Sequence, residues 1–228
     1  GNDDARKAVW FKLSELPSLA FDHEKILEKA LTITGFSRTK HLTNLLLGAA
    51  VGDICGSTYE FAPCKDYDVL DITREESDYT DDSVCTFAVA KALMDGEDMT
   101  RCLQTFCRND FLRGYGNRFS RWLFEPNPKP YNSYGNGSAM RCSAAGFMAK
   151  SKEECVYLAE KTAECTHNHP EGIKGAVATS LAIFYLKQGK DKDFVRKNIL
   201  DFYYPEWSDF TIDGLRAGYS FDESCQKS

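Results

Sequence analysis

Apolar residues recur at helical spacing along most of the chain. In the stretch 41–57 they stand at positions 42, 45, 46, 49 and 50, which is the period of one helix face. A second helix is predicted from the Asp81-Asp82 pair to Met94, with Gly96 just beyond its end. Its apolar residues wrap most of the circumference, so this helix is expected to be buried.

The rest of the chain continues the helical pattern. Further helices are predicted over residues 98–111, 138–149, 151–164, 171–187 and 191–201. Alternating strands joined by hairpin turns are not found, so the sequence predicts an all-α protein. Residues 1–40 are predicted to form a polar N-terminal extension with one helix over 22–31, and residues 41–228 the main domain.

Charge and cysteine content narrow the class of protein. The 228 residues hold 28 Lys and Arg against 34 Asp and Glu, a net charge of −6. Sequence-specific nucleic-acid binding is not expected, because phosphate contacts need clustered basic residues. A membrane role is not expected either, because no apolar run approaches the ~20 residues that span a bilayer. Nine scattered cysteines, without a Cys-x-x-Cys pair or a signal peptide, predict reduced thiols and a cytoplasmic location.

Three glycines lie four residues apart on one stripe of the first predicted helix: Gly48, Gly52 and Gly56. Each interior glycine costs a helix roughly 1 kcal/mol relative to alanine, so the bare stripe needs a reason. Tight helix packing is one explanation, and close approach of a ligand is the other. Asp53 and Glu60 favour the ligand, because a carboxylate on an apolar helix needs a partner such as a metal or a polar substrate.

The run Thr80-Asp81-Asp82 opens the second predicted helix. Helix capping explains it structurally, since hydroxyl and acidic side chains satisfy the free N–H groups of a first turn. The same oxygens also suit a hard cation, because Mg²⁺ prefers a few carboxylates and several waters. Adjacent acids splay apart, so each can face a different ion of a metal pair.

A glycine-containing loop precedes the predicted helix at 138–149. Gly135 and Gly137 would let backbone N–H groups approach an anion at a helix start. An ordinary turn and cap is the alternative. The neighbouring Tyr134, Ser138 and Arg141 favour a diphosphate, because they add hydroxyls, a cation and an aromatic ring.

A thiol and two imidazoles lie close together at Cys165, His167 and His169. Zinc is disfavoured, because imidazoles two residues apart diverge on a helix and no second ligand pair has zinc spacing. One imidazole is expected to hydrogen-bond a ligand or orient a carboxylate. A structural role stays open for His169.

Taken in order, these motifs resemble the ADP-ribosylglycohydrolase family. The matching runs are Gly48-x-x-x-Gly52-Asp53-x-x-Gly56-x-x-x-Glu60, Tyr79-Thr80-Asp81-Asp82-Ser83, Ser133-Tyr134-Gly135-Asn136-Gly137-Ser138-Ala139-Met140-Arg141 and Thr166-His167, and Arg113-Gly114-Tyr115-Gly116 is also similar to eukaryotic-type members. The resemblance covers residues 41–228. It implies a compact, orthogonally packed multi-helix fold with two Mg²⁺ or Mn²⁺ ions in a central cleft.

The resemblance also implies roles for single residues. Thr80, Asp81 and Asp82 are expected to ligate metal, and Glu60, Asp81 and Asp82 to act in catalysis. The substrate-binding residues are expected to be Ser133, Tyr134, Gly135, Asn136, Gly137, Ser138, Met140 and His167. The implied activity is metal-dependent hydrolysis of the glycosidic bond in ADP-ribosyl adducts, with ADP-ribose or an ADP-ribosylated substrate as the partner.

One part of the family's pattern is missing. The family carries a late Asp-x-Asp-Thr motif that completes both metal sites, whereas the latest such run here, Asp191-Lys192-Asp193, comes too early and lacks the Thr. The main domain is therefore expected to be C-terminally incomplete and to bind Mg²⁺ weakly. A catalytically impaired ADP-ribose-binding protein and a structural, crystallin-like relative remain as alternatives.

Overall fold

The structure is a computed structural model that describes residues 40–66 and 74–209 together with residues 211, 213, 214, 218 and 224. The predicted helix over 22–31 lies outside the described residues, as does the predicted extension except for Lys40, which begins the first described helix. The two-part division of the chain therefore stays a prediction.

Helices build the described part of the fold. They are α2 (Lys40–Gly56), η2 (Ser57–Tyr59), α3 (Asp81–Asp95), α4 (Met99–Asn109), α5 (Asn117–Leu123), α6 (Gly137–Met140), α7 (Ser143–Met148), α8 (Lys152–Glu164), α9 (Pro170–Lys187), α10 (Lys192–Val195), η4 (Arg196–Leu200), α11 (Asp201–Tyr203) and η5 (Pro205–Trp207). Across these ranges no strand occurs, and the β-structure is an isolated bridge between Gly135 and Ser224. The all-α prediction is confirmed.

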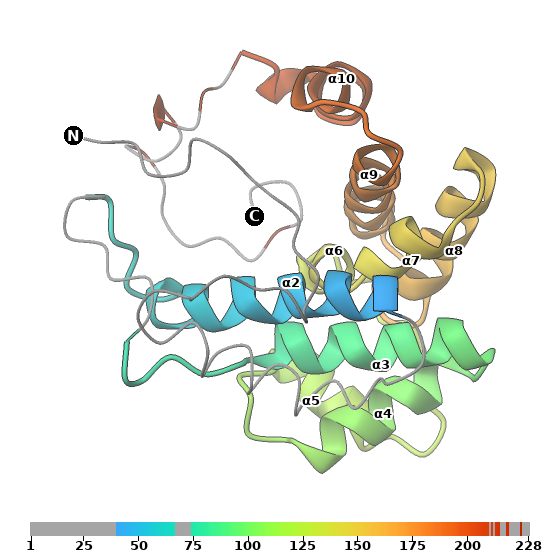
Figure 1. Cartoon of the computed structure of the whole chain (residues 1–228). Coiled ribbons are helices and arrows are strands. Elements are labelled where there is room, and N and C mark those ends of the chain that lie inside the picture. The colour runs from blue at the N-terminus through green and yellow to red at the C-terminus, as the bar shows by residue number, and fades with distance from the viewer. Residues whose placement is uncertain are drawn as a thin grey trace.

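Helix α3 lies at the centre of the N-terminal half. It packs between α2 and α4, and the three run side by side in Figure 1. Every residue from Ser83 to Ala90 is buried, as expected for a helix whose apolar residues wrap most of its circumference. The helix starts at an N-cap, Thr80, and ends at Gly96, whose φ of 67° places it in the left-handed region that favours glycine. Burial on all sides fixes the position of its N-terminus.

Helix α9 organises the C-terminal half. It packs against α6, α7 and α8 (Figure 1). Helix α7 comes close to α9 at Gly146, where an added Cβ would lie 2.2 Å from the carbonyl oxygen of Ser180. A glycine is therefore required there for the two helix backbones to touch. Within the described residues, no helix is both long and apolar enough to cross a membrane.

Two predicted helices differ from the structure in detail, and one helix of the structure was not predicted. The single helix expected over 138–149 is split into α6 and α7, because Arg141 and Cys142 depart from helical angles, with ψ near 0°. The helix expected over 191–201 continues from α10 through the π-helical turn η4 into α11. Helix α5 was not predicted, since seven residues are too few to show a period.

Candidate active site

A pocket of about 760 Å³ brings together residues from both halves of the fold. Its walls come from the end of α2, the start of α3, the loop into α5, the glycine loop before α6, and the turn after α8. The predicted site residues that line it are Glu60, Thr80, Asp81, Asp82, Ser133, Gly135, Asn136, Gly137, Met140 and His167. Four motifs distant in sequence thus share one cavity.

Two predicted residues do not line this pocket. Ser138 is fully buried, and its hydroxyl donates to the carbonyl oxygen of Gly172 at 2.6 Å. Tyr134 is 58% exposed, and its ring centroid lies 5.3 Å from that of His169. Ser138 therefore joins α6 to α9, and the substrate-binding role expected for these two side chains stays a prediction.

The glycine stripe has a different basis from helix packing. A Cβ added at Gly48, Gly52 or Gly56 would meet no atom within 4 Å in the described part of the chain. Tight packing against a described helix is therefore wrong as the explanation. Gly52 and Gly56 line the pocket, and close approach of a ligand to their bare backbone stays a prediction.

Asp53 joins α2 to the start of α3. Its carboxylate accepts hydrogen bonds from the backbone N–H of Thr80 at 2.8 Å and from the Thr80 hydroxyl at 2.6 Å. It also accepts from the N–H and hydroxyl of Ser83, at 3.1 and 2.6 Å. The sequence suggested a metal or substrate as the partner of Asp53; the structure shows that the partner is the first turn of α3. Asp53 thereby fixes the segment that carries Asp81 and Asp82.

Asp81 and Asp82, at the start of α3, are crowded by other carboxylates and partly buried. Burial, followed by the charges of Asp82 and Glu60, raises the pKa of Asp81 to about 7. Burial, followed by the charges of Asp53 and Glu60, raises the pKa of Asp82 to about 7. Crowded carboxylates of this kind gain from a positive charge placed between them.

A hard cation fits the chemistry of this donor set only in part. Asp81, Asp82 and Glu60 supply carboxylates and Thr80 a hydroxyl to the lining of the pocket, which are ligand types that Mg²⁺ prefers. Across the ranges described, however, no three acidic, cysteine or histidine side chains are grouped closely enough to hold an ion. The residues present therefore amount to a partial ligand set.

The opposite wall of the pocket is tightly built around Gly137 and His167. A Cβ added at Gly137 would lie 3.0 Å from two ring atoms of His167, so the loop backbone rests directly on the imidazole. The other ring nitrogen, Nδ1, is 2.7 Å from the hydroxyl of Thr166. His169 has a structural role, since its Nδ1 accepts from the N–H of Glu171 and caps α9.

Arg141 places a buried positive charge beside this wall. It is 1% exposed, yet no described carboxylate forms an ion pair with it. One terminal nitrogen donates to the carbonyl oxygen of Thr162 at 2.9 Å and to the hydroxyl of Thr166 at 2.8 Å. Its Nε has no partner among the described residues. Because Thr166 accepts from Arg141, its own proton can go to His167 Nδ1, which favours the tautomer with hydrogen on Nε2.

The lining of the pocket therefore combines opposite charges. The carboxylates of Asp81, Asp82 and Glu60 share it with the guanidinium of Arg141, which lies near His167. Burial, reinforced by the Arg141 charge, lowers the pKa of His167 to about 3. His167 is consequently a neutral hydrogen-bonding group at physiological pH.

Lowering the pH is expected to destabilise the folded chain through His167. In the unfolded chain the imidazole takes up a proton near its ordinary value of 6.5, whereas the folded pKa is about 3. The unfolded state thus binds more protons between these values, and the free energy of unfolding falls by up to about 1.4 kcal/mol per pH unit. His167→Asn removes this titration. Urea unfolding at several pH values should show a smaller acid-induced loss for the variant.

The comparison with the wild-type chain isolates the His167 contribution. Raised pKa values at Asp81 and Asp82 act with the opposite sign, because the folded state then holds protons longer as pH rises. That contribution is common to both proteins and cancels in the difference. Parallel stability curves for the two proteins would contradict the prediction.

The sequence did not single out several other groups that line the pocket. They include Cys85, Asn117, Arg118, Phe119 and Tyr131. Arg118 lies over the ring of Tyr131 at 4.8 Å and donates to its carbonyl oxygen at 2.6 Å. The run Arg113-Gly114-Tyr115-Gly116 was the signal for this wall, since it leads directly into α5.

Comparison with known sequences agrees with this arrangement. The sequence profile of the ADP-ribosylglycohydrolase family matches residues 37–224, which include every motif of the pocket. The chain belongs to this family. The ADP-ribosylglycohydrolase profile spans both the acidic motif and the glycine loop.

Individual relatives are more distant. ADP-ribosylhydrolase ARH3 of Homo sapiens is 29% identical over 184 aligned residues, covering 64% of this chain and 49% of that protein. The proteins of the same name from Bos taurus and Gallus gallus are 28% and 29% identical, each again covering 64% of this chain, with 49% and 50% of their own lengths. This ADP-ribosylglycohydrolase chain thus spans about half the length of the curated relatives it matches.

Proposed function

We propose that the pocket binds ADP-ribosyl adducts and hydrolyses their glycosidic bond. The observation that carries this proposal is one cavity whose lining combines the carboxylates of Glu60, Asp81 and Asp82 with the buried cation Arg141. A ligand with both a diphosphate and a scissile ribose complements that combination of charges. The family and the relatives named ADP-ribosylhydrolase support the same chemistry.

The part of the pocket lined by the glycine loop and His167 is proposed to bind the diphosphate and its ribose. Gly135, Asn136 and Gly137 present loop backbone, and the Nε2–H of His167 faces the same wall. The buried Arg141 is proposed to add positive charge to this part of the lining without a direct hydrogen bond to the ligand. Ser133 and Met140 complete this side of the cavity.

The part of the pocket lined by Glu60, Asp81 and Asp82 is proposed to hold the scissile ribose. Departure of the leaving group builds positive charge on the ribose ring, and nearby carboxylates stabilise that charge. Glu60 is exposed and lines the pocket, so it can exchange a proton with solvent and serve as the general acid or base. Asp81 and Asp82 are positioned by α3 to face the same space.

Thr80, Asp81 and Asp82 are the residues proposed to hold Mg²⁺ or Mn²⁺. When bound, such an ion would supply positive charge that orients ribose hydroxyls and offsets the crowded carboxylates. The ligand set is partial among the described residues, so the affinity of this chain for Mg²⁺ is expected to be weak. Residues 1–40 are proposed as an extension outside the domain of residues 41–228.

An ADP-ribose-binding protein without hydrolytic activity is the second candidate. The partial metal set favours it, because the glycine wall with His167 is complete while the acidic residues of the pocket supply too few grouped ligands. The free thiols of all eight cysteines in the described ranges support a cytoplasmic location for either function.

Release of ADP-ribose decides between the two functions. The chain is incubated with defined substrates linked through arginine, serine or an O-acetyl group, with Mg²⁺ or with a chelator, and ADP-ribose is measured by chromatography. Hydrolysis should fall by at least about 100-fold in Asp82→Asn. Asp98→Asn is the matched control, since Asp98 caps the remote helix α4. Binding of ADP-ribose without release would support the second candidate, and neither binding nor release would overturn both.

Gly137→Val is expected to abolish measurable ADP-ribose binding. Its side chain would collide with the His167 ring, which already lies 3.0 Å from a Cβ at this position. The loop would have to shift into the space assigned to the diphosphate. Isothermal titration calorimetry with ADP-ribose measures the effect. The control is Gly189→Asn, at a turn beyond α9. Gly116→Val would not serve as a control, because Gly116 also lines the pocket. Unchanged affinity in Gly137→Val would contradict the assignment of the glycine wall.

A further inference from the structure

We propose that Arg113 is a positioning residue for the Thr80-Asp81-Asp82 motif. Its side chain and its carbonyl oxygen together hold the backbone segment 78–81, so that the two acids face the pocket. The inference rests on the proposed function, because the purpose of this geometry is the cation site. Arg113 lies outside that pocket, in the loop between α4 and α5.

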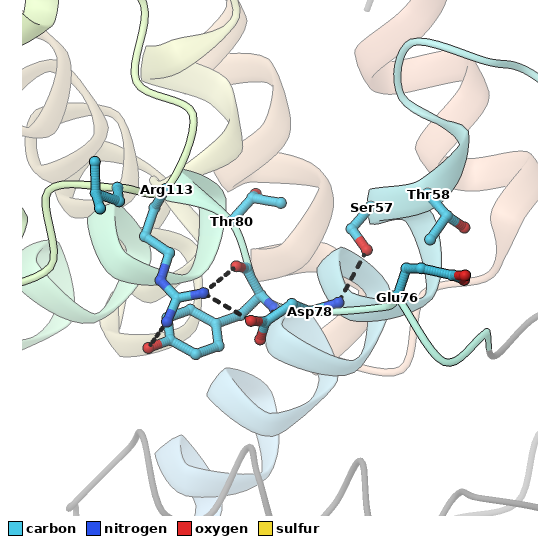
Figure 2. A pocket seen from close by; sticks show the side chains of 8 residues that line it. Ser57, Thr58, Glu76, Asp78, Thr80 and Arg113 are labelled. Carbon is cyan, nitrogen blue, oxygen red and sulfur yellow. Dashed lines mark hydrogen bonds and ion pairs between the residues drawn. The ribbon is translucent and has the colours of Figure 1, made fainter.

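The guanidinium contacts the segment that precedes the motif (Figure 2). It donates to the carboxylate of Asp78 at 2.9 Å and to the carbonyl oxygen of Tyr79 at 3.3 Å. Its plane lies over the Tyr79 ring at 3.5 Å, and another nitrogen donates to the Tyr79 hydroxyl. A fourth hydrogen bond, to the carboxylate of Asp110 at 2.8 Å, ties the group to the end of α4. These contacts leave residues 78 and 79 little freedom to move.

The main chain of the same loop reaches the motif itself. The carbonyl oxygen of Arg113 accepts from the N–H of Asp81 at 2.9 Å. Gly114 follows with φ at 93°, and a Cβ added there would lie 3.7 Å from an Asp81 carboxylate oxygen. The side-chain contacts of Arg113 therefore also fix the loop backbone against which Asp81 rests.

The motif is thus held from two sides. Asp53 accepts from Thr80 and Ser83 at the pocket side. Arg113 holds the other side, where a second cavity of about 460 Å³ is lined by Ser57, Asp78, Tyr79 and Arg113 (Figure 2). Ser57 adds a link by accepting from the N–H of Asp78 at 3.3 Å. Asp81 and Asp82 follow directly on the segment held in this way, so the two supports together set where the acids of the motif lie.

An arginine is required because several donors act at once. Lysine offers one compact charge, whereas the guanidinium presents five N–H groups in a plane and also stacks on a ring. Arg113→Lys should therefore keep the ion pair with one carboxylate and lose the stacked, forked contact. Arg113→Gln should lose the charge as well.

Native-state hydrogen exchange tests the positioning directly. We expect the N–H groups of Thr80, Asp81 and Ser83 to exchange at least about 10-fold faster in Arg113→Gln, and to an intermediate degree in Arg113→Lys. Arg108→Gln is the matched control, since Arg108 also donates to a backbone carbonyl and lies over an aromatic ring, at Leu123 and Phe124. Arg108→Gln should leave hydrogen exchange in the Thr80-Asp81-Asp82 motif unchanged, even if it lowers the melting temperature as much as Arg113→Gln does.

Manganese binding tests the purpose of the positioning. Electron paramagnetic resonance of Mn²⁺ added to the wild-type chain should show bound ion, and the affinity should fall at least about 10-fold in Arg113→Gln but not in Arg108→Gln. Unchanged exchange in the motif together with unchanged Mn²⁺ affinity would overturn the inference. Faster exchange in a chain that binds no Mn²⁺ even as wild type would support the positioning and overturn the proposed metal function, so the two failures are distinguishable.

Discussion

Gly146→Ala should destabilise the chain by roughly 3 kcal/mol, because the added methyl group meets backbone rather than a flexible side chain. The Cβ would lie 2.2 Å from the Ser180 carbonyl oxygen and 2.9 Å from its carbon. Neither atom can move without shifting α9 relative to α7. Urea unfolding followed by circular dichroism measures the change in the free energy of unfolding.

Gly48→Ala provides the matched control for this experiment. Gly48 also lies inside a helix, but an added Cβ there would meet nothing within 4 Å among described atoms. Its substitution should be neutral or stabilise the chain by up to about 1 kcal/mol through helix propensity. Equal effects of the two substitutions would contradict the close contact between α7 and α9.

Asp53→Ala should be nearly as damaging, and should also remove activity. The substitution leaves four donors of Thr80 and Ser83 without their acceptor. Ser83 is 1% exposed, so water does not readily replace the lost bonds. Buried donors left unpaired cost about 1–3 kcal/mol each, so the two donors of Ser83 alone lead us to expect a loss of roughly 3 kcal/mol. Thermal and urea unfolding measure it, alongside release of ADP-ribose.

The control for Asp53 is another aspartate at a helix start. Asp98 is exposed and accepts one hydrogen bond, from the N–H of Arg101 at 2.8 Å. Asp98→Ala should cost about 1 kcal/mol, as ordinary N-caps do, with activity retained. If Asp53→Ala were no more destabilising than Asp98→Ala, the bridging role of Asp53 between α2 and α3 would be wrong.

The helices of this chain were predictable where their pattern is long. Helix α3 has an apolar sequence on all sides and clear signals at both ends, and the structure confirms its buried position. The break at Arg141 and Cys142 was not predictable, because it depends on tertiary contacts. Arg141 reaches the carbonyl of Thr162 at the end of α8, and no local pattern reports a contact across 21 residues.

The sequence motifs indicated residues that come together in one pocket, but not the hydrogen bonds among them, and the functional roles of these residues stay predictions. The motifs indicated which residues share a cavity, and the structure brings Glu60, Asp82 and His167 together. The partner of Asp53 lies 27 residues away at Thr80, so spacing could not identify it. Ser138 shows the converse, since a hydroxyl in a ligand-binding motif turns away from the cavity to bond Gly172.

The paired acids at the start of α3 imply a trade-off between stability and function. A carboxyl group whose pKa rises on folding from 3.8 to about 7 disfavours the folded state at neutral pH, and this holds for both Asp81 and Asp82. Replacing either by its amide would relieve that strain while the fold kept its helix caps. The acidic pair thus makes the folded chain less stable at neutral pH than a counterpart with two amides, a cost that binding of a cation would offset.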